Sequence, residues 1–290
     1  MTVNKLHKYD LLKERRCYVM EQTKQPVFIT VSMLKGGVGK TDIAFNFAMW
    51  LALEKDKKIL GIDIDENCNF SQVMDVYDQE GTVANILEGS GEVKIHNIND
   101  NVDLIAGFNR LDDVQEAMVT SERKTMMLYM WLEDNYEALN INQYDFVIID
   151  THNDFGTATK NAMAVSHVTF SPIVPVAFSD AVTMQERLDE FRADVIDFKT
   201  RESYITTDLK LIANMVKHNT TNSREFEEHI ANNDDYIAKF PFKEIFNTSI
   251  QKKKSITELL AYPKNQSEKK FKKTFDENMK NMYEVVKKYQ

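Results

Sequence analysis

A glycine-rich segment between an apolar run and a helical pattern is the strongest constraint on how this chain folds. After the apolar run 27–31, and where apolar residues at helical spacing begin, stands the segment Lys35-Gly36-Gly37-Val38-Gly39-Lys40-Thr41. Glycines let backbone N–H groups turn toward phosphate oxygens, and the following helix adds the positive end of its dipole. We therefore predict an ATP-binding phosphate loop, in which Lys40 neutralises the β- and γ-phosphates and Thr41 binds Mg²⁺.

Continuous apolar runs alternate with helical patterns along the rest of the chain. Strands are expected over 27–31, 59–64, 102–105, 144–150, 168–176, 209–214 and 236–240. Helices are expected over 40–54, 121–139, 180–199, 255–261 and 267–288. Runs without polar alternation are typical of parallel strands that are covered on both faces. The sequence therefore predicts an α/β fold of the P-loop NTPase class, with a mostly parallel, twisted sheet and helices on both faces.

The domain organisation follows from length and composition. The chain has 290 residues, and no Pro-, Gly- or Ser-rich linker divides it. We expect one ATPase domain over 26–290, with its C-terminal helices, after a short helical extension over 1–25. No apolar run is long enough for a membrane span. The two cysteines, Cys17 and Cys68, lack metal-type spacing, which suits a cytoplasmic protein without a disulfide framework.

Three aspartates stand where predicted strands end. Asp150 ends the run 144–150, and Asp63 and Asp65 end the run 59–64 two residues apart. Side chains two residues apart in a strand point to the same sheet face. We expect Asp150 to hold Mg²⁺ through water, and one of the other two to assist the metal while its neighbour orients a water molecule.

The extra lysine at the start of the loop points to a family. With Lys35, the loop resembles the deviant Walker A motif of the ParA/MinD group of P-loop ATPases. The resemblance to the ParA branch extends over about 26–262, and residues 58–65, 82–89, 102–107, 144–151 and 250–258 resemble ParA segments. It implies a nucleotide-contacting set that comprises Lys35, Gly36, Gly37, Val38, Gly39, Lys40, Thr41, Asp42 and Asn214, with Asn214 at the adenine.

The resemblance also implies a mechanism. ATP would draw two subunits into a homodimer, in which Lys35 of one subunit reaches the phosphates of the other. Lys35, Lys40 and Asp65 would act in catalysis, with Asp65 positioning the attacking water and Asp63 assisting Thr41 and Asp150 at the metal. The ATP-bound dimer of ParA proteins binds DNA without sequence preference, and a ParB-type centromere-binding partner stimulates hydrolysis. The protein would then act on the nucleoid in DNA segregation.

The charge distribution suggests where DNA would bind. The net charge is −9, but residues 250–290 hold eleven lysines against five acidic residues, a local balance of +6. Non-specific DNA binding needs Lys or Arg contacts to phosphates. The candidates are Lys252, Lys253, Lys254 and Arg224, and a solvated lysine surface is the alternative for each.

Departures from the family pattern leave other functions open. Asp42 stands where the family usually has a second hydroxyl residue, and its charge is expected to weaken ATP binding or slow turnover. A nucleotide-gated scaffold with very low turnover is therefore one alternative. The other is a MinD-like membrane ATPase, because Phe271, Phe275, Met279, Met282, Val286 and Tyr289 form an apolar stripe. Such a stripe is more often packed on its own domain, so membrane binding is not expected.

Overall fold

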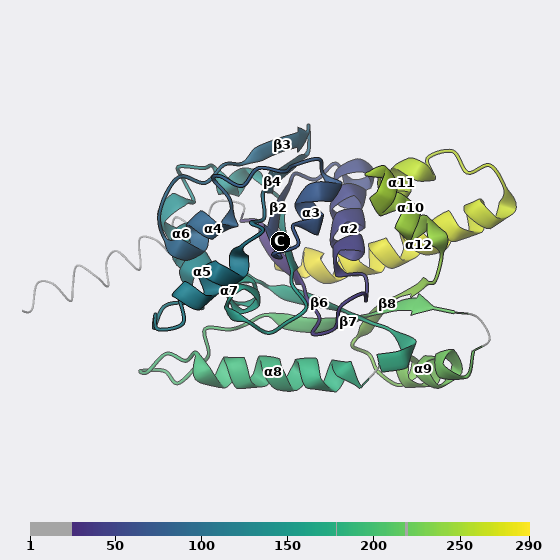
Figure 1. Ribbon diagram of the computed structural model, residues 1–290. Coiled ribbons are helices and arrows are strands. Elements are labelled where there is room, and N and C mark those ends of the chain that lie inside the picture. Colours follow the sequence, from purple (N-terminus) through teal and green to yellow (C-terminus); the bar gives the residue numbers. More distant parts are fainter. Residues whose placement is uncertain (1–24, 178, 218–219) are drawn as a thin grey trace, which may run out of the picture.

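The computed structural model describes residues 25–177, 179–217 and 220–290. Apart from Gln25, the extension predicted over 1–25 lies outside the described residues. The described residues form one eight-stranded sheet in the order β3-β4-β2-β5-β1-β6-β7-β8. Neighbouring strands are parallel except β3, which pairs antiparallel with β4. Figure 1 shows helices on both sides of the twisted sheet, as predicted.

The strands are β1 Val27–Val31, β2 Ile59–Ile64, β3 His96–Asn99, β4 Val102–Ile105, β5 Phe146–Thr151, β6 Val168–Ile173, β7 Asp208–Val216 and β8 Tyr236–Pro241. The α-helices are α2 Lys40–Lys55, α3 Asn69–Val73, α4 Val83–Glu88, α5 Leu111–Ala117, α6 Met127–Asn135, α7 Thr157–Val165, α8 Asp180–Asp194, α9 Thr221–Ala231, α10 Glu244–Lys252, α11 Ile256–Leu259 and α12 Gln266–Val286. Short 3₁₀ turns cover Ile141–Gln143, Pro175–Ala177 and Lys287–Tyr289.

Central strands are buried on both faces, which is why their sequences lack polar alternation. Every residue of β1, β2, β5 and β6 is buried. One face packs against α2 and the C-terminal helices, and the other against α4 to α7. The edge strand β3 reads His-Asn-Ile-Asn and is only partly buried. It contains no apolar run, so it was not predicted from the sequence.

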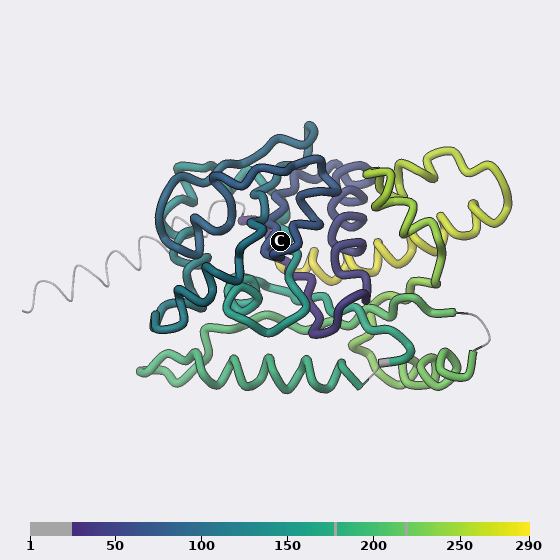
Figure 2. Tube along the Cα trace, viewed as in Figure 1, coloured from purple at the N-terminus to yellow at the C-terminus, as the bar shows by residue number. Residues whose placement is uncertain are grey.

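Helix α2 packs against the sheet, and eleven of its sixteen residues are buried. Figure 2 follows the C-terminal segment, in yellow, past α2, in purple. The indole Nε1 of Trp50 donates to Asp276 of α12 at 3.3 Å, and the ring of Tyr283 meets Trp50 edge-on. Asn46, buried within α2, accepts from the backbone N–H of Ile256 at 2.8 Å. The C-terminal helices therefore fix α2, and with it the loop that precedes α2.

The apolar stripe of α12 faces the protein core. Phe275, Met279, Met282 and Val286 are at most 1% exposed, and they belong to the cluster that also contains β1 and α2. Tyr289, beyond the helix, is 40% exposed. Packing on the chain's own domain, which the sequence favours over membrane contact, is thus observed. Among the described residues, no helix is both long and apolar enough to span a membrane.

Several predicted boundaries differ from those observed. The helix expected over 121–139 is confined to α6, and turns occupy its two ends. The strand expected over 168–176 ends at Ile173, and Pro175, which has no N–H to donate, opens a 3₁₀ turn. The helix expected over 180–199 ends at Asp194. No helix was predicted from the sequence at α3, α4 or α5, which are five to seven residues long, nor at the longer α7, α9 and α10.

Candidate active site

The glycine-rich loop lies at the carboxyl end of β1, where ligands bind in sheets of this kind. Gly37 and Gly39 have φ angles of 72° and 90°, in the left-handed region that favours glycine. A Cβ at Gly39 would also lie 2.5 Å from the amide nitrogen of Asn214. The conformation of the loop therefore requires glycine at position 39, directly before α2.

The two lysines of the loop have different surroundings. Lys40, in the first turn of α2, is 8% exposed, whereas Lys35 is exposed. Burial lowers the pKa of Lys40, and the nearby carboxylates of Asp150, Asp65 and Asp154 act in the opposite direction. Lys40 thus lies among carboxylates inside the site, and Lys35 lies at its mouth.

The candidate metal site consists of Thr41 and Asp150. The Thr41 hydroxyl donates to Asp150 Oδ2 at 2.6 Å. Asp150 is fully buried on β5, and its Oδ1 has no hydrogen-bond partner among the described residues. Burial, with the charge of Asp63 nearby, raises the pKa of Asp150 well above its usual range. An unpaired buried carboxylate oxygen beside a hydroxyl fits Mg²⁺, which takes oxygen ligands and keeps several waters.

Asp63 has other partners than the sequence suggested. Its Oδ2 accepts from the backbone N–H and the hydroxyl of Ser71 at 2.8 and 2.7 Å, and its Oδ1 accepts from the backbone N–H of Asp65. The Ser71 hydroxyl in turn accepts from the Gly107 N–H. Asp63 therefore holds the end of β2, and its contacts do not favour the metal role predicted from its position. Ser71 was missed because a lone serine has no recognisable motif.

The unfolding free energy should depend on pH through Asp63. Burial raises its pKa to about 7, above the value of about 3.9 for an exposed aspartate. The folded chain thus holds a proton that the unfolded chain releases. This stabilisation is complete below about pH 4 and is lost as the pH rises through about 7. Asp63→Asn, which cannot titrate, should flatten this fall in urea titrations. Parallel pH slopes for variant and wild type would argue against this assignment.

Asp65 lies close to Lys40 and carries its own local bonds. Its Oδ1 accepts from the backbone and side-chain nitrogens of Asn67 at 2.8 and 2.9 Å. Its side chain is buried, and its charge acts on both Lys40 and Asp150. The aspartate is thus held beside the phosphate loop, while its role in orienting water stays a prediction.

Asn214, at the end of β7, supports the phosphate loop directly. Its amide nitrogen donates to the Val38 carbonyl at 2.8 Å and packs on Gly39. The adenine contact implied by the family resemblance stays a prediction. The loop contact was missed because it joins residues far apart in the sequence.

Asp42 lies in the first turn of α2, next to Thr41. Its Oδ1 is covered and has no hydrogen-bond partner among the described residues. Burial raises the pKa of Asp42 to about 7. Its backbone carbonyl accepts from the amide of Asn46 at 2.8 Å. The residue that departs from the family pattern is therefore a covered carboxylate at the edge of the nucleotide site.

The candidate DNA-binding residues are separated by their contacts. Lys253, just after α10, donates to the Asp75 carboxylate and to the Tyr77 hydroxyl. Lys252, Lys254 and Arg224 are exposed. Lys253 is thus engaged within the chain, which leaves the other three as the stronger candidates for phosphate contacts.

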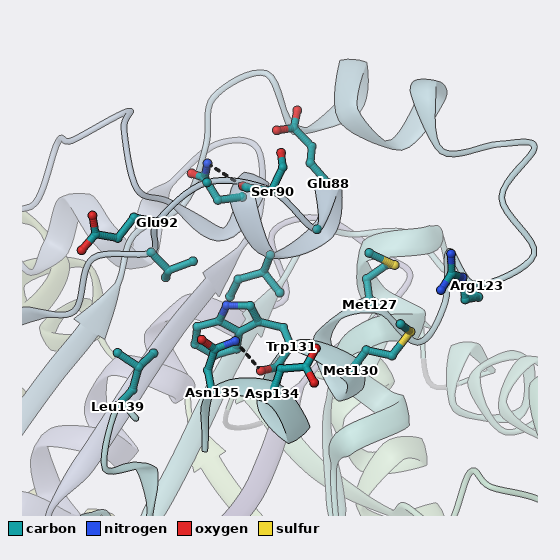
Figure 3. A pocket seen from close by; sticks show the side chains of 15 residues that line it. Glu88, Ser90, Glu92, Arg123, Met127, Met130, Trp131, Asp134, Asn135 and Leu139 are labelled. Carbon is teal, nitrogen blue, oxygen red and sulfur yellow. Dashed lines mark hydrogen bonds between the residues drawn. The ribbon is translucent and has the colours of Figure 1, made fainter. Parts of the chain in front are cut away.

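A cavity of about 520 Å³ lies between α4 and α6. Figure 3 shows Met127, Met130 and Trp131 around it, with Glu88 at the end of α4 and Glu92 in the segment that follows. None of the site residues predicted from the sequence lines this cavity. It is therefore separate from the nucleotide site.

Comparison with known proteins agrees with the geometry. A family model described as AAA domain (AAA_31) matches residues 27–197, more than half of the chain. The chain is 30% identical to the sporulation initiation inhibitor protein Soj of Bacillus subtilis over 154 aligned residues. The alignment covers 51% of this chain and 57% of Soj. The chain spans between 53% and 62% of the length of the curated relatives that it matches.

Two solved structures share the fold. A plasmid partition protein of Borrelia burgdorferi has a TM-score of 0.63 and 22% identity, over 79% of this chain and 96% of that one. A McdA variant from Cyanothece in complex with ATP has a TM-score of 0.72 and 17% identity, over 90% of this chain and 97% of that one. With the family match and the loop that begins at Lys35, the chain belongs to the AAA_31 family and is a ParA-type Walker ATPase.

Proposed function

We propose that the protein is a DNA partition ATPase. Two copies would assemble when ATP and Mg²⁺ are bound, and the homodimer would bind DNA without sequence preference. A ParB-type centromere-binding partner would stimulate hydrolysis and release the dimer from DNA. The cycle would take place in the cytoplasm, on the nucleoid. The likeness to the Borrelia plasmid partition protein and the site geometry support this proposal.

The residues of the site have distinct tasks in this proposal. The backbone of Gly36 to Gly39 surrounds the phosphates, and Lys40 neutralises them. Thr41 and Asp150 would hold Mg²⁺, which when bound would supply positive charge beside the phosphates. Asp65 orients the attacking water. Asp63 fixes the end of β2 through its hydrogen bonds with Ser71, and it thereby helps to hold Asp65 in position.

The exposure of Lys35 is the observation that carries the proposal. Lys40, which is proposed to serve the phosphates of its own chain, is buried. Lys35 is instead exposed at the mouth of the site. A second copy that carries ATP would offer negative charge to this exposed lysine. Dimerisation would thus depend on ATP.

DNA binding is assigned to Lys252, Lys254 and Arg224. These side chains are exposed, so they are free to approach DNA phosphates. Lys253 would first have to leave Asp75 and Tyr77. Two copies of the surface in one dimer would multiply the contacts, which makes DNA affinity depend on ATP.

The proposal predicts that wild-type protein binds unrelated duplexes equally well with ATP and Mg²⁺, but weakly with ADP. The affinity should fall steeply as salt rises. The double variant Lys252→Ala/Lys254→Ala should bind at least about tenfold more weakly and with a shallower salt slope, because each phosphate contact contributes to that slope. The measurement is fluorescence anisotropy of labelled DNA.

The matched control is Lys94→Ala/Lys199→Ala, which removes two exposed lysines elsewhere and should bind DNA as wild type does. Equal losses in both double variants would mean that only net charge matters. If the protein bound ATP but failed to bind DNA in any nucleotide state, the proposed role in DNA partition would be wrong.

A nucleotide-gated scaffold is the second candidate, and Asp42 favours it. A covered carboxylate beside the phosphate loop repels the triphosphate and is expected to slow each cycle. Turnover measured with DNA and the partner present distinguishes the two functions. Stimulation by these two ligands supports partition, and a rate that stays unchanged supports the scaffold.

A further inference from the structure

Asp42 has an acceptor oxygen without a donor. Its Oδ1 is covered, yet no described side chain or backbone N–H bonds to it. Two nearby donors are engaged elsewhere. The Asn46 amide donates to the Asp42 carbonyl, and Lys253 donates to Asp75 and Tyr77. A buried carboxylate oxygen without a partner costs free energy, and native structures usually give it one.

A cavity opens beside this carboxylate. It has a volume of about 420 Å³ and its lining includes Thr41, Asp42, Asn69, Gln72, Ile250 and Gln251. Small-molecule sites usually measure about 300–1,000 Å³, so the cavity is large enough for the sugar of a nucleotide. Thr41 belongs to both the candidate metal site and the cavity lining. The cavity therefore continues from the position of the phosphates.

The chemistry of a nucleotide restricts what Asp42 can bind. Phosphate oxygens only accept hydrogen bonds at neutral pH, so they cannot satisfy Asp42 in its ionised form, which needs a donor. The donors of ATP are its ribose hydroxyls and the amino group of its base. The ribose directly follows the α-phosphate, and Asp42 directly follows the loop residue Thr41. The ribose is thus the nearer donor.

We propose that the Asp42 carboxylate accepts a hydrogen bond from a ribose hydroxyl of the bound nucleotide and thereby selects ribonucleotides over deoxynucleotides. This inference rests on ATP binding at the proposed site, but not on DNA binding or partition. It gives the aspartate a function that a hydroxyl residue at this position fulfils less well, because hydrogen bonds to charged acceptors are the stronger ones.

The test compares ATP with 2′-deoxy-ATP and 3′-deoxy-ATP by calorimetry, without DNA and without a ribose-linked dye. Wild type should bind at least one deoxy analogue about tenfold or more weakly than ATP, the expected loss for one hydrogen bond to a charged group. In Asp42→Thr the ratio should fall to about twofold or less. Repulsion between Asp42 and phosphates acts on all three nucleotides alike, so the ratio isolates the sugar contact.

The control variant is Asp56→Asn, which removes one negative charge just after the other end of α2, where Asp56 accepts from Asn101. It should keep the wild-type ratio. Equal wild-type affinities for the three nucleotides, or an unchanged ratio in a folded Asp42→Thr protein, would overturn the inference and leave the partition proposal intact. Failure of wild type to bind any nucleotide would overturn both.

Discussion

Replacing Lys35 with alanine should lower ATP hydrolysis by about 100-fold or more, yet leave the ATP affinity of the single chain within about twofold. Lys35 is exposed, so it contributes little to phosphates bound by its own chain. Once two copies meet, its charge would lie at the transferring phosphate of the other copy. A cation supplied in this way is worth about 10³–10⁵ in related phosphoryl transfers.

Lys40→Ala provides the contrast. Lys40 is buried among carboxylates, so its removal should weaken ATP binding itself by about 100-fold or more and leave buried negative charge unopposed. Calorimetry for affinity and phosphate release for turnover separate the two variants. If Lys35→Ala lost affinity as severely as Lys40→Ala, Lys35 would serve its own chain, and the assembly model would be wrong.

Asp150→Asn should lower Mg²⁺-dependent hydrolysis by about 100-fold and, at the same time, make the nucleotide-free protein as stable as wild type or more stable. The first effect follows because loss of a metal-orienting carboxylate typically costs about 10- to 100-fold in metal affinity or activity. The second follows because wild type keeps a fully buried carboxylate whose Oδ1 lacks a partner. An amide oxygen can still accept from the Thr41 hydroxyl.

The measurements are turnover over a Mg²⁺ titration and thermal unfolding without nucleotide. Asp145→Asn is the matched control, because Asp145 precedes the other end of the same strand and bonds to Lys57 and to the Lys58 N–H. It should lower stability and leave turnover per folded molecule unchanged. Normal turnover in Asp150→Asn would exclude Asp150 from the metal site.

The sequence was most informative where local chemistry and burial coincide. The strands β1, β2 and β4 have the predicted bounds, because central parallel strands must be apolar on both faces. The sequence also assigned Thr41 and Asp150 to one metal site, since parallel strands bring their carboxyl ends to one edge. Their side chains are joined by a 2.6 Å hydrogen bond, and their role at the metal stays a prediction.

Other features depend on contacts that no local pattern encodes. Asp63 and Asp65 look equivalent in the sequence, but Ser71 satisfies only Asp63. Lys253 looks like its two lysine neighbours until the fold brings Asp75 beside it. The helix α10 follows β8 closely. In the sequence, its last residues were recognised as part of a ParA-like segment and were not predicted to be helical. Such distinctions arise from long-range packing.

The central claim is that ATP joins two copies of this chain across the exposed Lys35. The most direct test is the molecular mass in solution, measured by analytical ultracentrifugation. The protein is the Asp65→Ala variant, in which hydrolysis should be blocked. Its mass is compared in three states, with ATP and Mg²⁺, with ADP and Mg²⁺, and without nucleotide. We expect a dimer only with ATP and Mg²⁺, and we expect that dimer to be lost when Lys35→Ala is added. The same mass in all three states, with ATP bound, would contradict it.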